Sequence, residues 1–208
     1  MSGNRKRDKD PDKGVTRRGF LGSVGAGAVA AATGVSLRGE TAVQITNPDE
    51  MVQVALQING RTHRLLVEPR WTLLFVLRER LGITGAKVGC ERGECGSCTV
   101  LIDDRPRYAC MTLAVEAEGS EITTVEGLLD GEELGVVQQA FVAEDALQCG
   151  YCTPGQVIAA EGLLRANPSP TADEIRHGMS GNLCRCGAYT HIFKAVNHAA
   201  ELKKGGRP

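Results

Sequence analysis

The chain has 208 residues, of which 42% are hydrophobic and only 4% aromatic, so it has room for one or two small domains. Its formal net charge is −1, but residues 1–33 carry seven basic and three acidic side chains, which leaves the rest of the chain acidic. An acidic body excludes a protein that binds nucleic acid by electrostatic attraction.

The basic N-terminus leads into an Arg17-Arg18 pair and then into a mildly apolar segment of small residues. A polar segment, paired arginines and a weakly hydrophobic run form the layout of a twin-arginine export signal. The apolar run is short and rich in glycine compared with the roughly 20 residues that span a bilayer, which argues against a membrane anchor. We therefore expect a twin-arginine signal peptide over residues 1–33, a linker over residues 34–50 and a periplasmic protein.

Residues 51–126 are predicted to form a first domain built on a sheet. Apolar and polar side chains alternate along its first strand, and Asn59-Gly60 gives the two-residue turn of a hairpin. Thr72 is predicted to cap a helix with one apolar stripe that runs to Leu81. A hairpin, a helix across the sheet and further strands match a ferredoxin-like β-grasp. The expected strands cover 52–58, 62–67, 98–102, 106–108 and 121–124, and the third and fourth form a second hairpin that turns at Asp103-Asp104.

Residues 127–208 show the periodicity of helices instead. Thr153 is the predicted cap of one helix, with Pro154 at its first helical position, and Thr171 opens another with a capping box to Glu174. Four helices with short connections predict a four-helix bundle. The fold class is therefore α+β, a plant-ferredoxin-like β-grasp followed by a helical domain. The expected helices begin near Leu134, Thr153, Thr171 and Tyr189.

Eight cysteines form two groups of four with different spacing. The first group follows C-x4-C-x2-C with a distant fourth cysteine, which is the spacing of plant-type 2Fe-2S ligation. Gly89, Gly93 and Gly96 allow the backbone there to turn its N–H groups toward sulfur, which a negatively charged cluster requires. The predicted ligands of this cluster are Cys90, Cys95, Cys98 and Cys110.

The second group reads C-x2-C, a long gap and then C-x-C. This spacing alone also fits zinc, and an oxidising periplasm also permits disulfides. Export of a folded protein favours cysteines that are already occupied by a cofactor assembled in the cytoplasm, so we expect a second 2Fe-2S cluster. Its predicted ligands are Cys149, Cys152, Cys184 and Cys186.

Three segments around these cysteines are specific enough to suggest a family. They are Gly-Cys-x4-Cys-Gly-Ser-Cys at 89–98, Gln-Cys-Gly-Tyr-Cys-Thr-Pro-Gly-Gln at 148–156 and Gly-Asn-Leu-Cys-Arg-Cys-Gly-Ala-Tyr at 181–189. They closely resemble the iron-sulfur subunit of the xanthine dehydrogenase and aldehyde oxidoreductase family of molybdenum hydroxylases. The resemblance covers about residues 51–200 in the family's order, without a departure at any ligand position.

The resemblance implies a position for each cluster. The first group would hold a distal 2Fe-2S cluster near the exit for electrons. The second group would hold a proximal 2Fe-2S cluster close to the molybdopterin cofactor of a separate large subunit. In the family, the glutamine before the C-x2-C and the last cysteine of the C-x-C lie beside the pterin, and in this chain these residues are Gln148 and Cys186.

The implied function is electron transfer in a periplasmic molybdenum hydroxylase that oxidises an aldehyde or an aromatic N-heterocycle. Electrons would pass from molybdopterin in the partner subunit through two 2Fe-2S clusters to an FAD subunit or a c-type cytochrome. We predict no catalytic acid, base or nucleophile here, because the substrate chemistry belongs to the partner. The histidines have no metal-ligand spacing with the cysteines and are expected to pack or face solvent; they are His63, His177, His191 and His198.

Two other functions fit parts of the pattern. A free-standing exported 2Fe-2S ferredoxin would need only the β-grasp half, so the helical half argues against it. A zinc or disulfide module without a redox role would need neither the glycines around the first group nor two separate four-cysteine sites.

Overall fold

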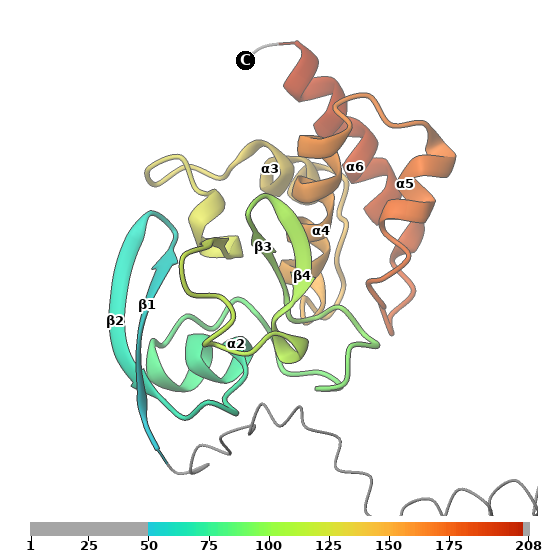
Figure 1. Cartoon of the computed structure of the whole chain (residues 1–208). Coiled ribbons are helices and arrows are strands. Elements are labelled where there is room, and N and C mark those ends of the chain that lie inside the picture. The colour runs from blue at the N-terminus through green and yellow to red at the C-terminus, as the bar shows by residue number, and fades with distance from the viewer. Residues whose placement is uncertain (1–49, 206–208) are drawn as a thin grey trace, which may run out of the picture. The chain divides into compact units, whose positions relative to one another are not determined.

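The computed structural model describes residues 50–205, which belong to a single unit with mixed α+β architecture. The predicted signal peptide at 1–33 and all but the last residue of the predicted linker at 34–50 lie outside the described residues. In Figure 1 the hairpin of β1 and β2 lies on one side, the helices α4, α5 and α6 lie on the other, and β3 and β4 lie between them. Within the described part, no helix is long and apolar enough to cross a membrane.

The sheet has five strands in the order β2-β1-β5-β3-β4. Strands β1 and β5 pair in parallel, and every other neighbouring pair is antiparallel. Both predicted hairpins are present, because Asn59 (φ 50°) and Gly60 (φ 72°) form one tight turn and Asp103 (φ 49°) and Asp104 (φ 63°) form the other. The strands are β1 (Val52–Ile58), β2 (Arg61–Val67), β3 (Thr99–Ile102), β4 (Arg105–Tyr108) and β5 (Glu121–Thr123).

The helix that follows the first hairpin differs from its prediction in its second half. Thr72 caps α2 (Leu73–Phe75) as expected, by accepting a hydrogen bond from the Phe75 amide at 3.2 Å. The chain then continues as the π-helix η1 (Val76–Arg80), so the prediction of one regular α-helix from Thr72 to Leu81 was wrong there. The wider turn is closed by the Leu81 amide, which donates to the Val76 carbonyl at 3.1 Å.

A guanidinium group holds the loop after this π-helix. Nη1 of Arg78 donates to the carbonyl oxygens of Thr84 and Ala86, both at 2.9 Å. These two residues lie on the segment that leads to the first cysteine group, so the irregular turn places Arg78 where it can brace that segment. Apolar periodicity carries no signal for such a turn, because Leu73, Leu74 and Leu77 have the spacing of an ordinary α-helix.

The second half of the chain contains helices close to their predicted positions. Thr153 is the first residue of its helix and Cys152 takes the cap position, one residue earlier than predicted, so Pro154 is the second helical residue instead of the first. The capping box of Thr171 and Glu174 is confirmed. The helices are α3 (Val136–Ala143), α4 (Thr153–Ala166), α5 (Ala172–Gly178) and α6 (Tyr189–Lys204), and the short helical turns are η2 (Ala109–Met111) and η3 (Val125–Leu128).

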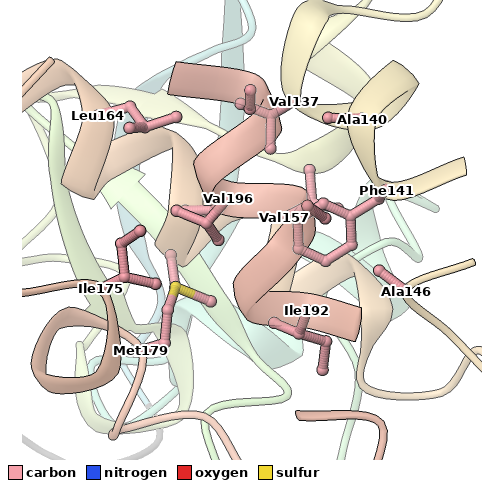
Figure 2. Close-up of a cluster of buried hydrophobic side chains, with 14 of the residues drawn as sticks. Val137, Ala140, Phe141, Ala146, Val157, Leu164, Ile175, Met179, Ile192 and Val196 are labelled. Carbon is pink, nitrogen blue, oxygen red and sulfur yellow. The ribbon is translucent and has the colours of Figure 1, made fainter. Parts of the chain in front are cut away.

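Two apolar cores stabilise the described chain. One lies between the sheet and the segment α2–η1, where Leu56, Leu73 and Leu77 are fully buried. The other joins α3, α4, α5 and α6, and Figure 2 shows Phe141 and Ile192 in it. Burial of such side chains is worth about 1.5–3 kcal/mol each relative to solvent exposure.

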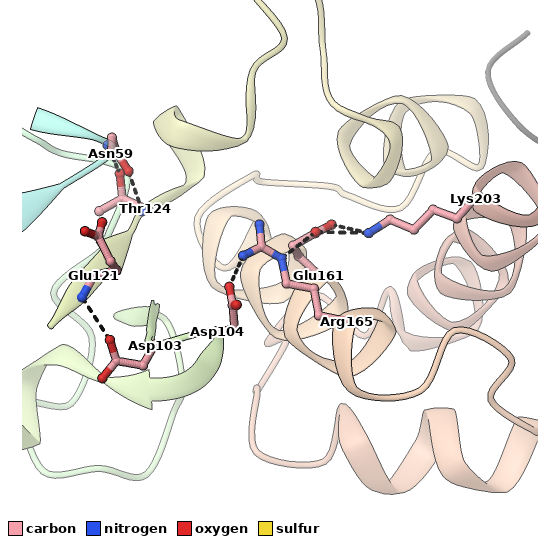
Figure 3. Close-up of polar contacts among 8 residues, drawn as sticks. All are labelled: Asn59, Asp103, Asp104, Glu121, Thr124, Glu161, Arg165 and Lys203. Atoms are coloured by element: carbon pink, nitrogen blue, oxygen red, sulfur yellow. Dashed lines mark hydrogen bonds and ion pairs between the residues drawn. The ribbon is translucent and has the colours of Figure 1, made fainter.

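Helix α4 packs directly on the sheet and joins the two cores. A Cβ atom at Gly162 would lie 2.4 Å from Cγ of Pro106 and 3.0 Å from Cδ2 of Leu101, so only glycine permits this approach. Beside this contact, the carboxylate of Glu161 accepts from Nε of Arg165 and from Nζ of Lys203, both at 2.9 Å. Arg165 also pairs with Asp104 in the β3–β4 turn, so one charge network links α4, α6 and the sheet (Figure 3).

The variant Gly162→Ala tests this close packing, because the sign of its change in unfolding free energy depends on the contact. Alanine in a helix interior normally stabilises by about 1 kcal/mol relative to glycine. Here the added methyl group overlaps Pro106, so we expect the free energy of unfolding to fall by about 1–3 kcal/mol in a urea titration. Gly205→Ala is the control, because its nearest neighbour would be 3.7 Å away. An increase in stability for Gly162→Ala would contradict the packing described here.

Candidate functional site

The first cysteine group surrounds the start of β3. Cys90 and Cys95 lie on the loop between η1 and β3, Cys98 directly precedes β3, and Cys110 lies in η2. Cys98 and Cys110 are buried, with 4% and 6% of their surfaces exposed, and Cys90 and Cys95 are half-buried. Cys98 lies close enough to Cys110 and Cys95, and Cys90 close enough to Cys95, for each neighbour to shift its pKa. The structure therefore brings the predicted ligands close together.

Backbone amides and burial act oppositely on these thiols. Sγ of Cys90 accepts hydrogen bonds from the amides of Arg92 (3.5 Å) and Glu94 (3.2 Å), which lower the pKa of Cys90 to about 7. Burial raises the pKa of Cys98 to about 12. The thiolate of Cys98 thus needs a bound cation to offset its burial, whereas the backbone already stabilises the thiolate of Cys90.

The glycines of this loop are required by its tight path. A Cβ atom at Gly89 would lie 2.6 Å from Sγ of Cys95, so any larger residue would occupy the space of the sulfur. Gly93 has φ +77° and Gly96 has φ +70°, which other residues rarely adopt. The prediction that these glycines shape the loop around its cysteines is consistent with this geometry.

The second cysteine group gathers at the ends of the helices. Cys149 lies between α3 and α4, Cys152 caps α4, and Cys184 and Cys186 lie on the loop between α5 and α6. Cys152 and Cys184 lie close enough for each to shift the pKa of the other. Cys184 is buried, whereas Cys149 and Cys186 are exposed. This site therefore has a buried inner pair and an outer pair on the surface.

The pKa values of Cys152 and Cys184 are shifted in opposite directions, as are those of Cys98 and Cys90 in the first group. Burial raises the pKa of Cys152 to about 12. Burial also acts to raise the pKa of Cys184, but hydrogen bonds led by the Ala188 amide, which lies 3.4 Å from Sγ, outweigh it and lower that pKa. Each group thus contains one sulfur that receives backbone N–H groups and one that is desolvated.

Each group consists of four thiols, which is the donor set of a plant-type 2Fe-2S cluster. A tetrahedral zinc site would bring four ligands to a single ion, whereas a 2Fe-2S cluster takes its four thiolates on two irons. All eight cysteines are free thiols in the structure. Thiols with amides directed at sulfur are the donors that such a cluster requires.

The outer residues of the second group include polar, charged and apolar side chains. Gln148 and Arg185 are exposed. Leu147, which precedes Gln148, is 37% exposed, and Leu183, which precedes Cys184, is 52% exposed. The two residues predicted to face a partner's cofactor, Gln148 and Cys186, thus both lie on an accessible surface.

The loops of the two groups are in direct contact, which the sequence did not reveal. The Leu183 amide donates to the Cys95 carbonyl at 2.9 Å, and Oη of Tyr108 donates to the Gly181 carbonyl at 2.8 Å. Oη of Tyr151 donates to the Val88 carbonyl at 2.5 Å. The two predicted sites are therefore neighbours, although nearly a hundred residues separate Cys90 from Cys186.

The histidines take part in other contacts. Nδ1 of His198 lies 2.9 Å from the Glu144 carboxylate, and Nδ1 of His191 lies 2.8 Å from the Glu144 carbonyl oxygen. His63 lies on β2 and His177 on α5. These positions agree with packing and surface roles.

Two families match the chain, one over each cysteine group. Residues 56–124 match a family described as 2Fe-2S iron-sulfur cluster binding domain, and residues 124–197 match a family described as [2Fe-2S] binding domain. Each matched segment contains one complete cysteine group.

This chain matches curated iron-sulfur subunits along nearly the whole length of those proteins. The aldehyde oxidoreductase iron-sulfur-binding subunit PaoA of Escherichia coli O157:H7 is 42% identical over 96% of this chain and 95% of that protein. The nicotinate dehydrogenase small FeS subunit of Eubacterium barkeri is 45% identical over 72% of this chain and 96% of that protein. The chain belongs to the iron-sulfur subunits of the xanthine dehydrogenase and aldehyde oxidoreductase family of molybdenum hydroxylases. The resemblance inferred from the sequence is confirmed.

A solved structure supports the same membership. A chain of quinoline 2-oxidoreductase from Pseudomonas putida 86 superposes with a TM-score of 0.72 and 48% identity, covering 76% of this chain and 99% of that chain. As a member of this family of iron-sulfur subunits, the protein is part of an oxidoreductase complex. The prediction of an enzyme subunit is therefore confirmed as well.

Replacing one buried cysteine in each group tests whether the groups are separate sites. We expect Cys98→Ala and Cys184→Ala each to lower the iron content of the full chain from about four to about two atoms. Each variant should lose a different electron paramagnetic resonance (EPR) signal. Ser97→Ala is the control, because Ser97 is buried beside Cys98 and supplies no thiol. Wild-type iron content in Cys98→Ala would show that this cysteine is not a ligand.

Proposed function

We propose that this chain is the electron-transfer subunit of a periplasmic molybdenum hydroxylase that oxidises an aldehyde or an aromatic N-heterocycle. The contact between the two cysteine loops carries the proposal, because it joins a site with exposed outer cysteines to a second site beyond it. The relatives support the substrate classes, since they are named as an aldehyde oxidoreductase subunit, a nicotinate dehydrogenase subunit and a quinoline oxidoreductase.

Two 2Fe-2S clusters are the proposed cofactors of the chain itself. When bound, such clusters accept and release single electrons, which is the chemistry they would supply here. The buried cysteines anchor each site, and the amides at Cys90 and Cys184 stabilise negative charge on sulfur. The distal site would use Cys90, Cys95, Cys98 and Cys110, and the proximal site Cys149, Cys152, Cys184 and Cys186.

The domain division follows the two sites. We infer a β-grasp domain over residues 51–126 and a four-helix domain over residues 127–208. The two apolar cores support this division, because one joins the sheet with α2–η1 and the other joins α3 to α6.

A molybdopterin-containing subunit is the proposed partner at the proximal site. The exposed Gln148 and Cys186 would face that subunit, and the apolar side chains of Leu147 and Leu183 beside them suit a protein interface. The acceptor, an FAD subunit or a c-type cytochrome, would bind near the loop of Cys90 to Cys98. Dehydration of the exposed cysteines on docking would isolate the proximal site from water.

Co-purification tests the proposed assembly. We expect the tagged full chain, produced in its native cells, to bring down a larger subunit that contains molybdenum. Addition of an aldehyde or N-heterocycle substrate should then bleach the visible absorption of the iron-sulfur chain. An iron-loaded chain that purifies alone from its native host would favour the free-standing ferredoxin instead.

The export proposal rests on the sequence pattern around Arg17-Arg18, which lies outside the described residues. A signal of this kind moves folded proteins, so a chain with assembled clusters could carry its partner with it. The proposal therefore concerns both subunits of the complex.

Substitution of both arginines tests the route. We expect Arg17→Lys with Arg18→Lys to retain this chain and the large subunit in the cytoplasm, as detected by cell fractionation. Arg5→Lys with Arg7→Lys is the control, because it makes the same charge-conserving change in the basic segment outside the pair. Arrival of the chain in the periplasm despite the substitutions at Arg17 and Arg18 would contradict twin-arginine export.

A further inference from the structure

Asn182 is a buried amide that connects the two cysteine loops. It lies on the loop of the second group, and only 5% of its surface is exposed. Its Nδ2 donates to the Gly96 carbonyl at 2.9 Å and to Oγ1 of Thr99 at 3.1 Å, both on the segment of the first group. Its own main-chain oxygen accepts a hydrogen bond from Nε2 of Gln156 at 2.9 Å, and Gln156 is 1% exposed.

The next residue makes a parallel contact. The Leu183 amide donates to the Cys95 carbonyl at 2.9 Å, so Asn182 and Leu183 bind the consecutive carbonyls of Gly96 and Cys95. Leu183 is followed directly by Cys184. These adjacent hydrogen bonds therefore connect the backbone of Cys95 in the first group with the residue before Cys184 in the second group.

The backbone of the two loops and of α4 is closely packed at this junction. A Cβ atom at Gly96 would lie 2.5 Å from the Gly181 carbonyl oxygen and 2.7 Å from Cγ of Asn182. On the other side, a Cβ atom at Gly155 would lie 2.4 Å from the Gly96 carbonyl oxygen. The peptide of Gly96 is thus confined between Asn182 and the backbone of α4, and its position depends on both.

Loss of the Asn182 amide would release this constraint. The Gly96 carbonyl would keep the hydroxyl and the amide of Thr99, at 2.6 and 3.1 Å, but both bonds lie within its own loop. Without the Asn182 amide, this carbonyl would therefore have no hydrogen bond from the second loop. Asn182 is therefore a buried side chain that, together with the Leu183 amide and Oη of Tyr108, holds the two loops together.

We propose that Asn182, anchored by Gln156, is a positioning residue that fixes the distance between the two iron-sulfur sites and thereby the rate of electron transfer between them. The proposal rests on the proposed function and assigns the spacing of its two sites to one side chain. Electron tunnelling falls exponentially with distance, so a small shift of one loop changes the rate more than it changes stability.

Two substitutions and a matched control separate this role from general stability. Asn182→Asp keeps the size of the side chain but replaces its donor with an oxygen that faces the Gly96 carbonyl. Asn182→Ala removes the contact without adding charge. Asn59→Asp makes the same chemical change at an amide that binds Thr124 and contacts neither cysteine loop through its hydrogen bonds.

The readout is the magnetic interaction between the two reduced sites in the full chain, measured by low-temperature EPR after dithionite reduction. This interaction depends on the inverse cube of the separation. We expect both Asn182 variants to keep wild-type iron content and both signals, but to lose or narrow the splitting between them, while Asn59→Asp retains it. If Asn182→Asp does not fold, Asn182→Ala decides.

Three results would overturn the inference. Unchanged splitting in the folded, iron-loaded Asn182 variants would show that the amide does not set the spacing. Loss of iron from Asn182→Ala would assign it a structural role alone. A wild-type chain without iron would overturn the proposed function as well, so the failures of the two proposals are distinguishable.

Discussion

The backbone of α4 packs against the loop of the first cysteine group, and this contact fixes the two cysteine sites relative to each other. Gly155 approaches the Gly96 carbonyl so closely that it cannot carry a side chain, and Gly96 cannot carry one because Gly181 and Asn182 occupy the space. Because Cys152 caps the same helix, this approach fixes one ligand of the second group relative to the first group. Further along α4, the contact of Gly162 with Pro106 sets the direction of the helix.

The cysteines and the cores stabilise each other. Each half has an apolar core of modest size, and the desolvated thiols of Cys98 and Cys152 lie at the edges of these cores. Burial makes their thiolates unfavourable without a bound cation, so cluster binding and folding are coupled in free energy. The second group leaves Cys149 and Cys186 exposed, which a protein partner would cover. Iron loading should therefore precede docking of the partner.

Much of this arrangement could be predicted from local patterns. The turns at Asn59-Gly60 and Asp103-Asp104 and the capping box at Thr171 are local features, and the structure has them where they were expected. The cysteine spacing and its flanking residues indicated the family. The π-turn after Phe75 leaves no local signal because Leu73, Leu74 and Leu77 have ordinary α-helical spacing. The contacts of Asn182 leave none because its partners lie more than eighty residues away. Contacts between distant loops leave no periodic signal in either segment.

The central claim is that one chain holds two 2Fe-2S clusters on two joined loops. Iron and acid-labile sulfide analysis of the purified full chain, combined with spin quantification of its fully reduced EPR spectrum, tests it most directly. The account predicts about four irons, about four sulfides and about two unpaired spins per chain. A chain with about two irons and one spin, or one that binds zinc at either group, would contradict it.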